Sequence, residues 1–361
     1  MLRVHIRPHW EISFHSEPPL DTAALLGLLL GIDETGSIAQ AAKKGGLSYR
    51  YAWGLLRDAE RLFGQQLIDS GRGRGTQLTP LAQKLVWADH RIAARLSPTL
   101  ESLASELENE LSKVMQAGLH TIRMDASHGF AVAALTGYLN RIELPVELRY
   151  RTCTDALAAL AQRECDLAGF HAPEGKFEQR TMAQYMRWLD PAQHCLVHIA
   201  RREQGLVVAR GNPLKIEGLR DLARHGLRFV NRQVGSGTRL LLEMMLQDEG
   251  IAPESINGYN SAEFTHSAVA AYIASGMGDV GLGVRPAAAR FNLDFIPLIQ
   301  ERYFFALRSD ALEEPLMRQL LAILQKGAYH ELVDALPGYA ARDTGRIETL
   351  AEAFPRMTLA R

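Results

Sequence analysis

The sequence has few cysteines, no long apolar run and almost no net charge. Its three cysteines, in 361 residues, are odd in number and widely spaced, which fits reduced thiols, and they offer no C-x-x-C metal or redox pair. The longest apolar run, residues 23–32, is too short to span a bilayer, and the N-terminus lacks the apolar core of a signal peptide. A formal net charge of -1 gives no general attraction to nucleic acid or membranes, so any such attraction must be local. We therefore expect reduced thiols, a cytoplasmic location and no membrane partner.

Familiar catalytic motifs are also missing. No Walker lysine follows GSGT, and neither a G-x-S-x-G elbow nor an H-E-x-x-H pair occurs. Gly276, Gly278 and Gly281 satisfy G-x-G-x-x-G, but a helical pattern precedes them and a strand pattern follows, the reverse of a dinucleotide-binding turn. We expect no enzyme activity, no catalytic residue, no catalytic cofactor and no metal site.

The length favours two or three domains, and the patterns along the chain suggest where they divide. We expect a winged helix-turn-helix over residues 1–80, a linker and dimerisation helix over 81–117, an α/β domain over 118–345 and a C-terminal tail over 346–361. The first residues, MLRVHIRPHWEIS, alternate like a strand.

The helix-turn-helix outline occupies residues 20–79. The segment PLDTAALLGLLL predicts a helix that starts near Asp21, and two short helical patterns follow, with Ser37 and Ser48 at N-cap positions. The next segment, QQLIDSGRGRGTQLTP, reads as two short strands around a glycine-rich tip. This arrangement is typical of a winged helix-turn-helix.

This segment is the one basic part of a nearly neutral chain. Residues 36–79 carry seven Lys and Arg against three Asp and Glu, a local charge of +4. Phosphate neutralisation drives DNA affinity, and the first residues of a recognition helix meet base edges. The alternatives are that Trp53 is buried in the core and that the arginines are only solvated. The candidate DNA contacts are Ser48, Tyr49, Arg50, Trp53, Arg57, Arg72 and Arg74.

One long apolar stripe follows the wing. Apolar residues recur at spacings of three and four from residue 81 to 114, which predicts a helix that Pro98 kinks or divides, with Ser97 capping a second helix. A partner helix from a second copy would cover the stripe, and packing on the following domain is the alternative.

Beyond Gly118, short apolar runs alternate with helical patterns, which favours an α/β domain with mostly parallel strands and a binding crevice at their carboxyl ends. In NRQVGSGTRLLLEMML a strand ends in a glycine turn and a helix begins near Thr238, an arrangement suited to an oxyanion or a carboxylate. A plain tight turn is the alternative. Other turns with hydroxyls and histidines follow nearby strands. The candidate effector contacts are Ser127, His128, Thr152, His171, Arg232, Ser236, Thr238, Arg239, His266 and Ser267, with Arg149 and Arg151 as weaker ones.

The basic segment resembles a known family. The run Ser48, Tyr49, Arg50, Ala52, Trp53 and the later LTP resemble the winged helix-turn-helix of the ModE family of molybdate-responsive regulators, and more distantly that of LysR-type regulators. Residues 119 to about 340 resemble the two-lobed periplasmic-binding-protein-like domain found fused to such modules, with FVNRQVGSGTRLLLEMML as the most specific element. ModE proteins carry small molybdate-binding barrels there instead.

The resemblance implies a DNA-binding transcriptional regulator, dimeric or tetrameric, whose C-terminal domain senses a small anion. Molybdate or tungstate is the first expectation for that effector, and formate, another carboxylate, sulfate or phosphate stays open. The alternatives from other classes are an oxyanion carrier that does not bind DNA and an enzyme of molybdenum-cofactor assembly.

Overall fold

The computed structural model describes residues 2–13, 19–71, 75–115 and 120–357, and it divides into two compact units. Residues 7–96 form the first, which we call the winged unit. Residues 1–6 and 97–361 form the second, the two-lobed unit. The chain therefore crosses between the units twice, after residue 6 and after residue 96. The domain boundaries at residues 80, 117 and 345 remain predictions.

The winged unit contains three short helices and a hairpin. The helices are α1 (Thr22–Thr35), α2 (Ile38–Lys44) and α3 (Tyr49–Phe63), and the antiparallel strands are β1 (Ile68–Gly71) and β2 (Gly75–Leu78). The side chains of Asp21, Ser37 and Ser48 cap the three helices, as their sequence positions predict. Leucines, isoleucines and alanines of all three helices pack into one core. The predicted helix-turn-helix and wing are thus confirmed.

A single helix, α4 (Pro80–Met115), follows the wing and continues into the two-lobed unit. It runs unbroken through Pro98, so the prediction of a second helix capped by Ser97 is wrong. The Ser102 hydroxyl donates a hydrogen bond to the Pro98 carbonyl at 2.8 Å. An apolar stripe along α4 remains exposed in this chain. It consists of Leu96, Leu103, Leu107, Leu111, Val114 and Met115.

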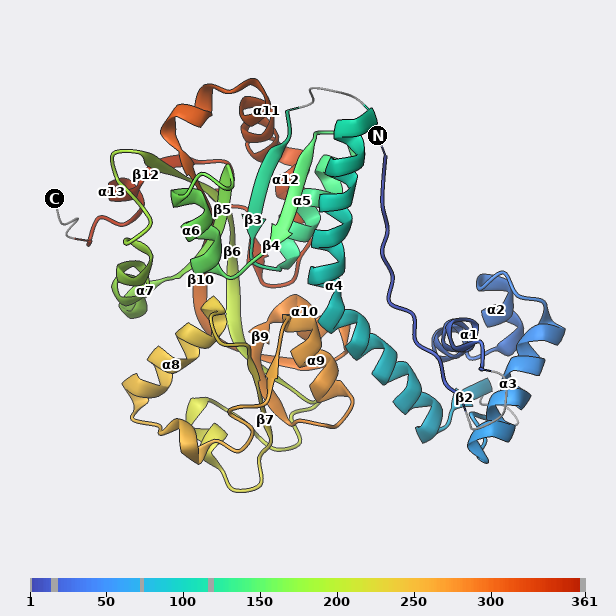
Figure 1. Cartoon of the computed structure of the whole chain (residues 1–361). Helices are drawn as coiled ribbons and strands as arrows, with labels where there is room; N and C mark the ends of the chain where they lie inside the picture. Colours follow the sequence, from blue (N-terminus) through green and yellow to red (C-terminus); the bar gives the residue numbers. More distant parts are fainter. Residues whose placement is uncertain (1, 14–18, 72–74, 116–119, 358–361) are drawn as a thin grey trace. The chain divides into compact units, whose positions relative to one another are not determined.

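One mixed sheet runs through the two-lobed unit, in the strand order β4-β3-β5-β10-β6-β9-β7-β8 (Figure 1). Lobe 1 contains β3 (Ile122–Ala126), β4 (Val146–Tyr150) and β5 (Leu167–Pro173), and lobe 2 contains β7 (Phe229–Arg232), β8 (Ala262–Glu263) and β9 (Val280–Val284). The antiparallel pair β6 (His194–Val208) and β10 (Asp294–Arg308) passes through both lobes. The expected α/β fold is confirmed, but the strands are less uniformly parallel than predicted, because β6 and β10 carry the chain across the lobes in opposite directions.

Helices cover both faces of the sheet. Lobe 1 has α5 (Phe130–Arg141), α6 (Cys153–Ala161), α7 (Glu178–Tyr185), α11 (Pro315–Leu324), α12 (Gly327–Asp334) and α13 (Leu350–Ala353). Lobe 2 has α8 (Gly237–Glu249), α9 (His266–Ala274) and α10 (Arg285–Arg290). Each lobe has its own hydrophobic core.

The two ends of the chain pack against lobe 1. The strands β11 (Tyr339–Ala340) and β12 (Ile347–Thr349) pair with β6, so the start of the segment expected to be a tail contributes a short strand to the sheet. At the other end, residues 2–11 form no strand, although their alternation predicts one. They are held by α4 instead: the Arg3 guanidinium and the Val4 amide donate to Glu108 at 3.2 and 2.7 Å. In the described part of the chain, no helix is both long enough and apolar enough to cross a bilayer.

Candidate anion site and nucleic-acid interface

Four helices of the two-lobed unit begin where a strand ends. Helices α5 and α6 follow β3 and β4 in lobe 1, and α8 and α9 follow β7 and β8 in lobe 2. The first turn of a helix leaves backbone N–H groups unbonded and carries the positive end of the helix dipole. The turns before these helices therefore favour a negatively charged ligand near them.

The turn before α8 also joins the two lobes. A methyl group placed on Gly235 would lie 3.5 Å from the Thr152 Cγ2, and one on Gly237 would lie 3.5 Å from the Cys153 Sγ. The backbone of the GSG turn thus packs directly against the start of α6. Gly235 has a φ of +84°, which side chains rarely adopt, so glycine is required there for the turn itself.

Arg232, at the end of β7, is a buried cation whose hydrogen-bonding capacity is only partly used by the described residues. Its side chain is buried, and its Nε and Nη1 atoms have no hydrogen-bond partner among the described residues. Burial, followed by the charge of Arg202, lowers the pKa of Arg232 to about 9. A buried charge that is not fully paired is costly. A bound anion would both neutralise this guanidinium and accept its free N–H groups.

Arg202, in the middle of β6, is equally buried but fully paired. Its guanidinium lies 2.7 Å from a Glu301 carboxylate oxygen and donates to the Gln204 side chain at 3.1 Å. Sequence reasoning missed Arg202, because its carboxylate partner lies 99 positions away on β10. A small cavity lies beside it. The cavity is lined by Ser127, Gly129, Ala131, Val132, His171, Arg202, Tyr303 and Tyr339.

Three of the predicted histidines lie in this region. The His171 Nδ1 is 3.4 Å from the Ser127 hydroxyl and 3.8 Å from the Cys153 Sγ. The buried Nδ1 of His266, the first residue of α9, has no hydrogen-bond partner among the described residues.

The His128 ring completes the group. Burial lowers the pKa of His128 to about 4 and the pKa values of His171 and His266 well below their usual value. The charge of Arg232 contributes to lowering the pKa of all three histidines. At neutral pH they are uncharged, so each ring offers one donor and one acceptor.

Other predicted contacts serve the local structure. The Arg239 guanidinium bonds to Glu243 at 2.8 Å and to the Tyr259 carbonyl at 3.1 Å, and it stacks over the Tyr259 ring. The Ser236 hydroxyl caps α8, and that of Thr152 caps α6. Thr238 and Ser267 are buried in the first turns of α8 and α9.

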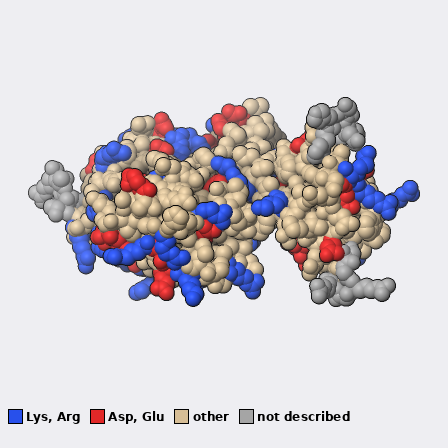
Figure 2. All heavy atoms as spheres, turned by 90° about the horizontal axis from the view of Figure 1, so that it is seen from below, with Lys and Arg blue, Asp and Glu red and all other residues tan. Residues whose placement is uncertain are grey.

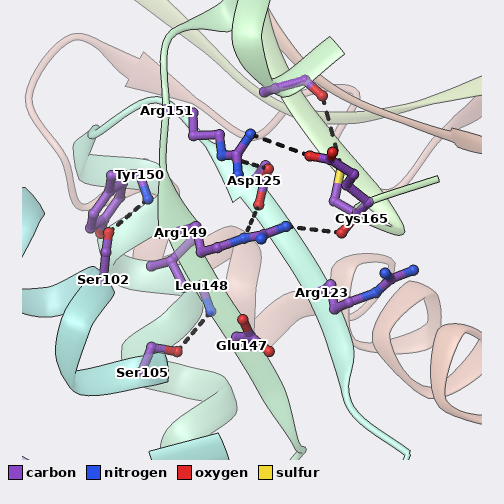
Figure 3. A network of polar contacts seen from close by, with 12 residues as sticks. Ser102, Ser105, Arg123, Asp125, Glu147, Leu148, Arg149, Tyr150, Arg151 and Cys165 are labelled. Atoms are coloured by element: carbon purple, nitrogen blue, oxygen red, sulfur yellow. Dashed lines mark hydrogen bonds and ion pairs between the residues drawn. The ribbon is translucent and has the colours of Figure 1, made fainter. Parts of the chain in front are cut away.

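The weaker candidates Arg149 and Arg151 both bind the buried carboxylate of Asp125, at 2.8 and 3.1 Å (Figure 3). They form a structural network on lobe 1 with little capacity left for a ligand. In the described residues, no group of three or more His, Cys, Asp or Glu side chains is arranged to hold a metal ion.

The winged unit presents a polar and aromatic surface at the start of α3. Ser48, Tyr49 and Arg50 are exposed in its first turn, and the Ser48 hydroxyl accepts the Tyr51 amide at 3.2 Å. Tyr51 is also exposed, and its hydroxyl donates to the Asp21 carboxylate at 3.0 Å.

The side chain of Trp53 has features of both expected roles, a buried core residue and a DNA contact. It is half-buried against the core, and its ring packs edge-on against Tyr49 at 6.3 Å, with the exposed Arg57 guanidinium 5.9 Å away. The predicted wing contacts Arg72 and Arg74 lie outside the described residues. Basic side chains gather on one side of the smaller body in Figure 2.

Family models match both parts of the chain. Residues 24–83 match the bacterial regulatory helix-turn-helix protein, lysR family, and residues 137–325, more than half of the chain, match the PBP superfamily domain.

Three curated proteins are similar to parts of it. The uncharacterized protein YvgK of Bacillus subtilis is 33% identical over 199 residues, which are 55% of this chain and 64% of YvgK. The molybdenum-pterin-binding protein MopB of Rhodobacter capsulatus is 28% identical over 39% of this chain and 53% of its own. The molybdenum transport protein ModE of Herbaspirillum seropedicae is 46% identical over 17% of this chain and 25% of its own. The chain thus spans less than two thirds of each of these relatives.

A solved structure, a Corynebacterium glutamicum OxyR mutant with bound hydrogen peroxide, has 18% identity and a TM-score of 0.42 over 87% of this chain and 94% of its own. The domain matches, taken with the two units described above, identify the chain as a member of the PBP superfamily that carries a LysR-family helix-turn-helix.

Proposed function

We propose that the two-lobed unit senses a small oxyanion, with molybdate or tungstate as the first candidate. The observation that carries this proposal is the buried Arg232 guanidinium with two nitrogens that lack partners. Four helix starts and three neutral histidines add hydrogen-bond donors in the same region. The choice of molybdate or tungstate rests on the names of two relatives, the molybdenum-pterin-binding MopB and the molybdenum transport protein ModE.

A small carboxylate such as formate is the second candidate. A guanidinium binds a carboxylate as readily as it binds a tetrahedral oxyanion, so Arg232 alone does not choose between them. We propose no catalysed reaction, because the matched helix-turn-helix family is one of bacterial regulatory proteins.

The proposed action follows from the two lobes and the winged unit. We propose that the anion favours one arrangement of the lobes, and that this changes the affinity of α3 for double-stranded DNA. A ligand shifts such an equilibrium only through its differential affinity for the two arrangements. We also propose that the exposed stripe of α4 pairs with a second copy, giving a homodimer or tetramer whose two winged units read two half-sites.

The decisive experiment is a calorimetric titration of the full chain with molybdate, tungstate, sulfate and formate in parallel, repeated with Arg232→Met. Binding of molybdate and tungstate that is lost in the variant supports the oxyanion sensor. Binding of formate alone would replace the effector by a carboxylate. If the variant binds as well as the parent protein, the anion site lies elsewhere.

DNA binding is measured on the same protein by fluorescence anisotropy at low salt, where phosphate contacts contribute most. Failure to bind any duplex selected from a random library would favour the oxyanion carrier.

A further inference from the structure

The second half of α4 belongs to the two-lobed unit and turns a polar face toward strand β4. Among the described residues, β4 pairs with no strand other than β3, so the backbone N–H groups on its other edge make no hydrogen bonds to a strand. The amides of Leu148 and Tyr150 on this edge donate to the hydroxyls of Ser105 and Ser102, both at 2.8 Å (Figure 3). Two serines, one turn apart on α4, therefore attach this helix to the edge of the sheet.

The attachment of Tyr150 to Ser102 leads to the surroundings of the candidate anion site. The Tyr150 ring packs edge-on against the His128 ring, with 4.9 Å between the centroids. His128 stands in the turn between β3 and α5, between Ser127 and Gly129, which line the cavity beside Arg202. Tyr150 also faces α4 through its hydroxyl, whose pKa is raised by burial and by the Glu101 carboxylate. Tyr150 thus contacts the surroundings of the anion site on one side and α4 on the other.

The same attachment reaches the Pro98 turn of α4. The Ser102 hydroxyl accepts a hydrogen bond from the Tyr150 amide and also donates one to the Pro98 carbonyl, at 2.8 Å. Pro98 has no N–H, so the helix lacks one backbone hydrogen bond at this turn. The division between the two compact units, after residue 96, falls in the same turn.

We propose that Tyr150 and Ser102 form the joint through which the occupancy of the anion site changes the Pro98 turn of α4, and hence the DNA affinity of the winged unit. This inference rests on the proposed function, since it concerns the regulation of the same site. An anion bound at Arg232 alters the surroundings of His128, against which the Tyr150 ring packs. A shift of Tyr150 moves its amide, and the Ser102 hydroxyl must follow the amide or lose its bond. Ser102 and Tyr150 are positioning residues that need not touch the anion.

The test compares Ser102→Ala with Ser105→Ala in the full chain. Each variant removes one hydroxyl that accepts a hydrogen bond from a β4 amide. Only Ser102 bonds to Tyr150, whose ring packs on His128. For each variant we would measure molybdate affinity by calorimetry and the affinity for a library-selected duplex with and without molybdate. We expect Ser102→Ala to bind molybdate within about twofold of the parent protein. Its ratio of DNA affinities with and without molybdate should fall about three- to tenfold toward unity, the equivalent of one hydrogen bond.

Ser105→Ala should keep the ratio of the parent protein, and Ser102→Thr, which restores a hydroxyl, should recover most of it. The proposal is wrong if Ser102→Ala keeps the parent protein's ratio of DNA affinities with and without molybdate. It is also wrong if Ser105→Ala lowers this ratio as much as Ser102→Ala does.

A second measurement separates the joint from the identity of the effector. Hydrogen exchange of the α4 amides between residues 94 and 102 is measured without any anion. Loss of the Ser102 hydroxyl is expected to speed exchange in this turn about three- to tenfold, whereas loss of the Ser105 hydroxyl leaves it unchanged. If the parent protein binds no tested anion but shows this pattern, the proposed effector class fails and the joint stands. Equal exchange in both variants would reject the joint even if molybdate binds.

Discussion

Arg202 and Arg232 are close enough for the charge of Arg202 to lower the pKa of Arg232, yet among the described residues only Arg202 has a carboxylate within 3 Å, that of Glu301 at 2.7 Å. The paired Arg202 therefore serves the structure of this domain, whereas Arg232 keeps N–H groups that can bind a ligand. The difference between the two makes the anion site testable by stability as well as by binding.

Replacing Arg232 by methionine should therefore stabilise the protein without ligand. The variant removes a buried charge, two nitrogens of which have no hydrogen-bond partner among the described residues, and keeps an apolar side chain of similar length. We therefore expect the free energy of unfolding to rise by about 1–4 kcal/mol. The same variant should lose the rise in melting temperature that molybdate produces in the parent protein. Thermal unfolding with and without molybdate measures both effects.

Arg239→Met is the matched control for that experiment. Its guanidinium is already bonded to Glu243 and to the Tyr259 carbonyl, so we expect a loss of stability and an unchanged molybdate response. Stabilisation by both substitutions, or by neither, would contradict the assigned difference between the two arginines.

The buried histidines predict a loss of stability in acid. The pKa of His128 is lowered to about 4 in the folded chain, so the unfolded chain binds more protons between about pH 4 and its own pKa near 6.5. The free energy of unfolding then falls as the pH falls through this window, by up to about 3 kcal/mol for His128. His171 and His266 shift in the same direction.

Urea unfolding at several pH values across this window, without anion, checks the prediction. A His128→Gln variant should show a flatter dependence. A parent protein whose stability is constant over the window would show that the histidines are not buried in their neutral form.

Local patterns predicted much of this structure, and contacts between distant segments account for the rest. Ser37 and Ser48 could be identified as caps, because a cap depends on residues three positions away. Arg232, Ser127, His128 and His266 could be placed at or just after strand ends, because the end of a strand is also a local pattern. The expectation of a strand-end turn at His171 is wrong, because His171 lies inside β5 and pairs with Tyr303. The Arg202 pair could not be predicted, because its register is set by the β6–β10 pairing.

Arg239 was assigned to the anion site from its place near a glycine turn. It is the third residue of α8, where the turn of the helix points it toward Tyr259 and away from the GSG turn. The sequence pattern indicates that a residue is near a helix start, but not the direction of its side chain.

Gly54 predicts a gain in stability for the winged unit. It lies within α3, and a methyl group added there would meet no atom within 4 Å. Alanine favours a helix over glycine by about 1 kcal/mol, so Gly54→Ala should raise the thermal stability of this unit by up to that amount. Gly64→Ala is the opposing control: Gly64 ends α3 with a φ of +63°, and alanine there should cost about 1 kcal/mol or more. Effects of the same sign in both variants would contradict the backbone argument.

Arg50 and Arg57 should affect DNA binding differently. Arg50 is exposed in the first turn of α3, so Arg50→Ala should cost about 1–3 kcal/mol on the preferred duplex and reduce discrimination among sequences. Arg57 lies two turns later. Its replacement by alanine should weaken the binding of all duplexes alike and reduce the slope of log affinity against log salt concentration by about one. Anisotropy titrations at several salt concentrations distinguish the two roles, and unchanged curves for both variants would remove α3 from the interface.

The exposed stripe of α4 predicts self-association. Replacing Leu103 and Leu111 together by glutamine removes two apolar side chains from the proposed contact, which should weaken association at least about tenfold. Leu214→Gln, at an equally exposed leucine of lobe 2, is the control. Sedimentation velocity measures the association, and identical behaviour of all variants would place the contact on another surface.

The two crossings between the units also fix an order of assembly during synthesis. Residues 7–96 are synthesised before Glu108, so the hydrogen bond from Arg3 to Glu108, 105 residues apart, forms only after the whole winged unit has been made. This hydrogen bond closes a long loop of the chain that contains the winged unit. A nascent chain that stops at residue 96 would contain the unit proposed to bind DNA without the unit proposed to sense the anion.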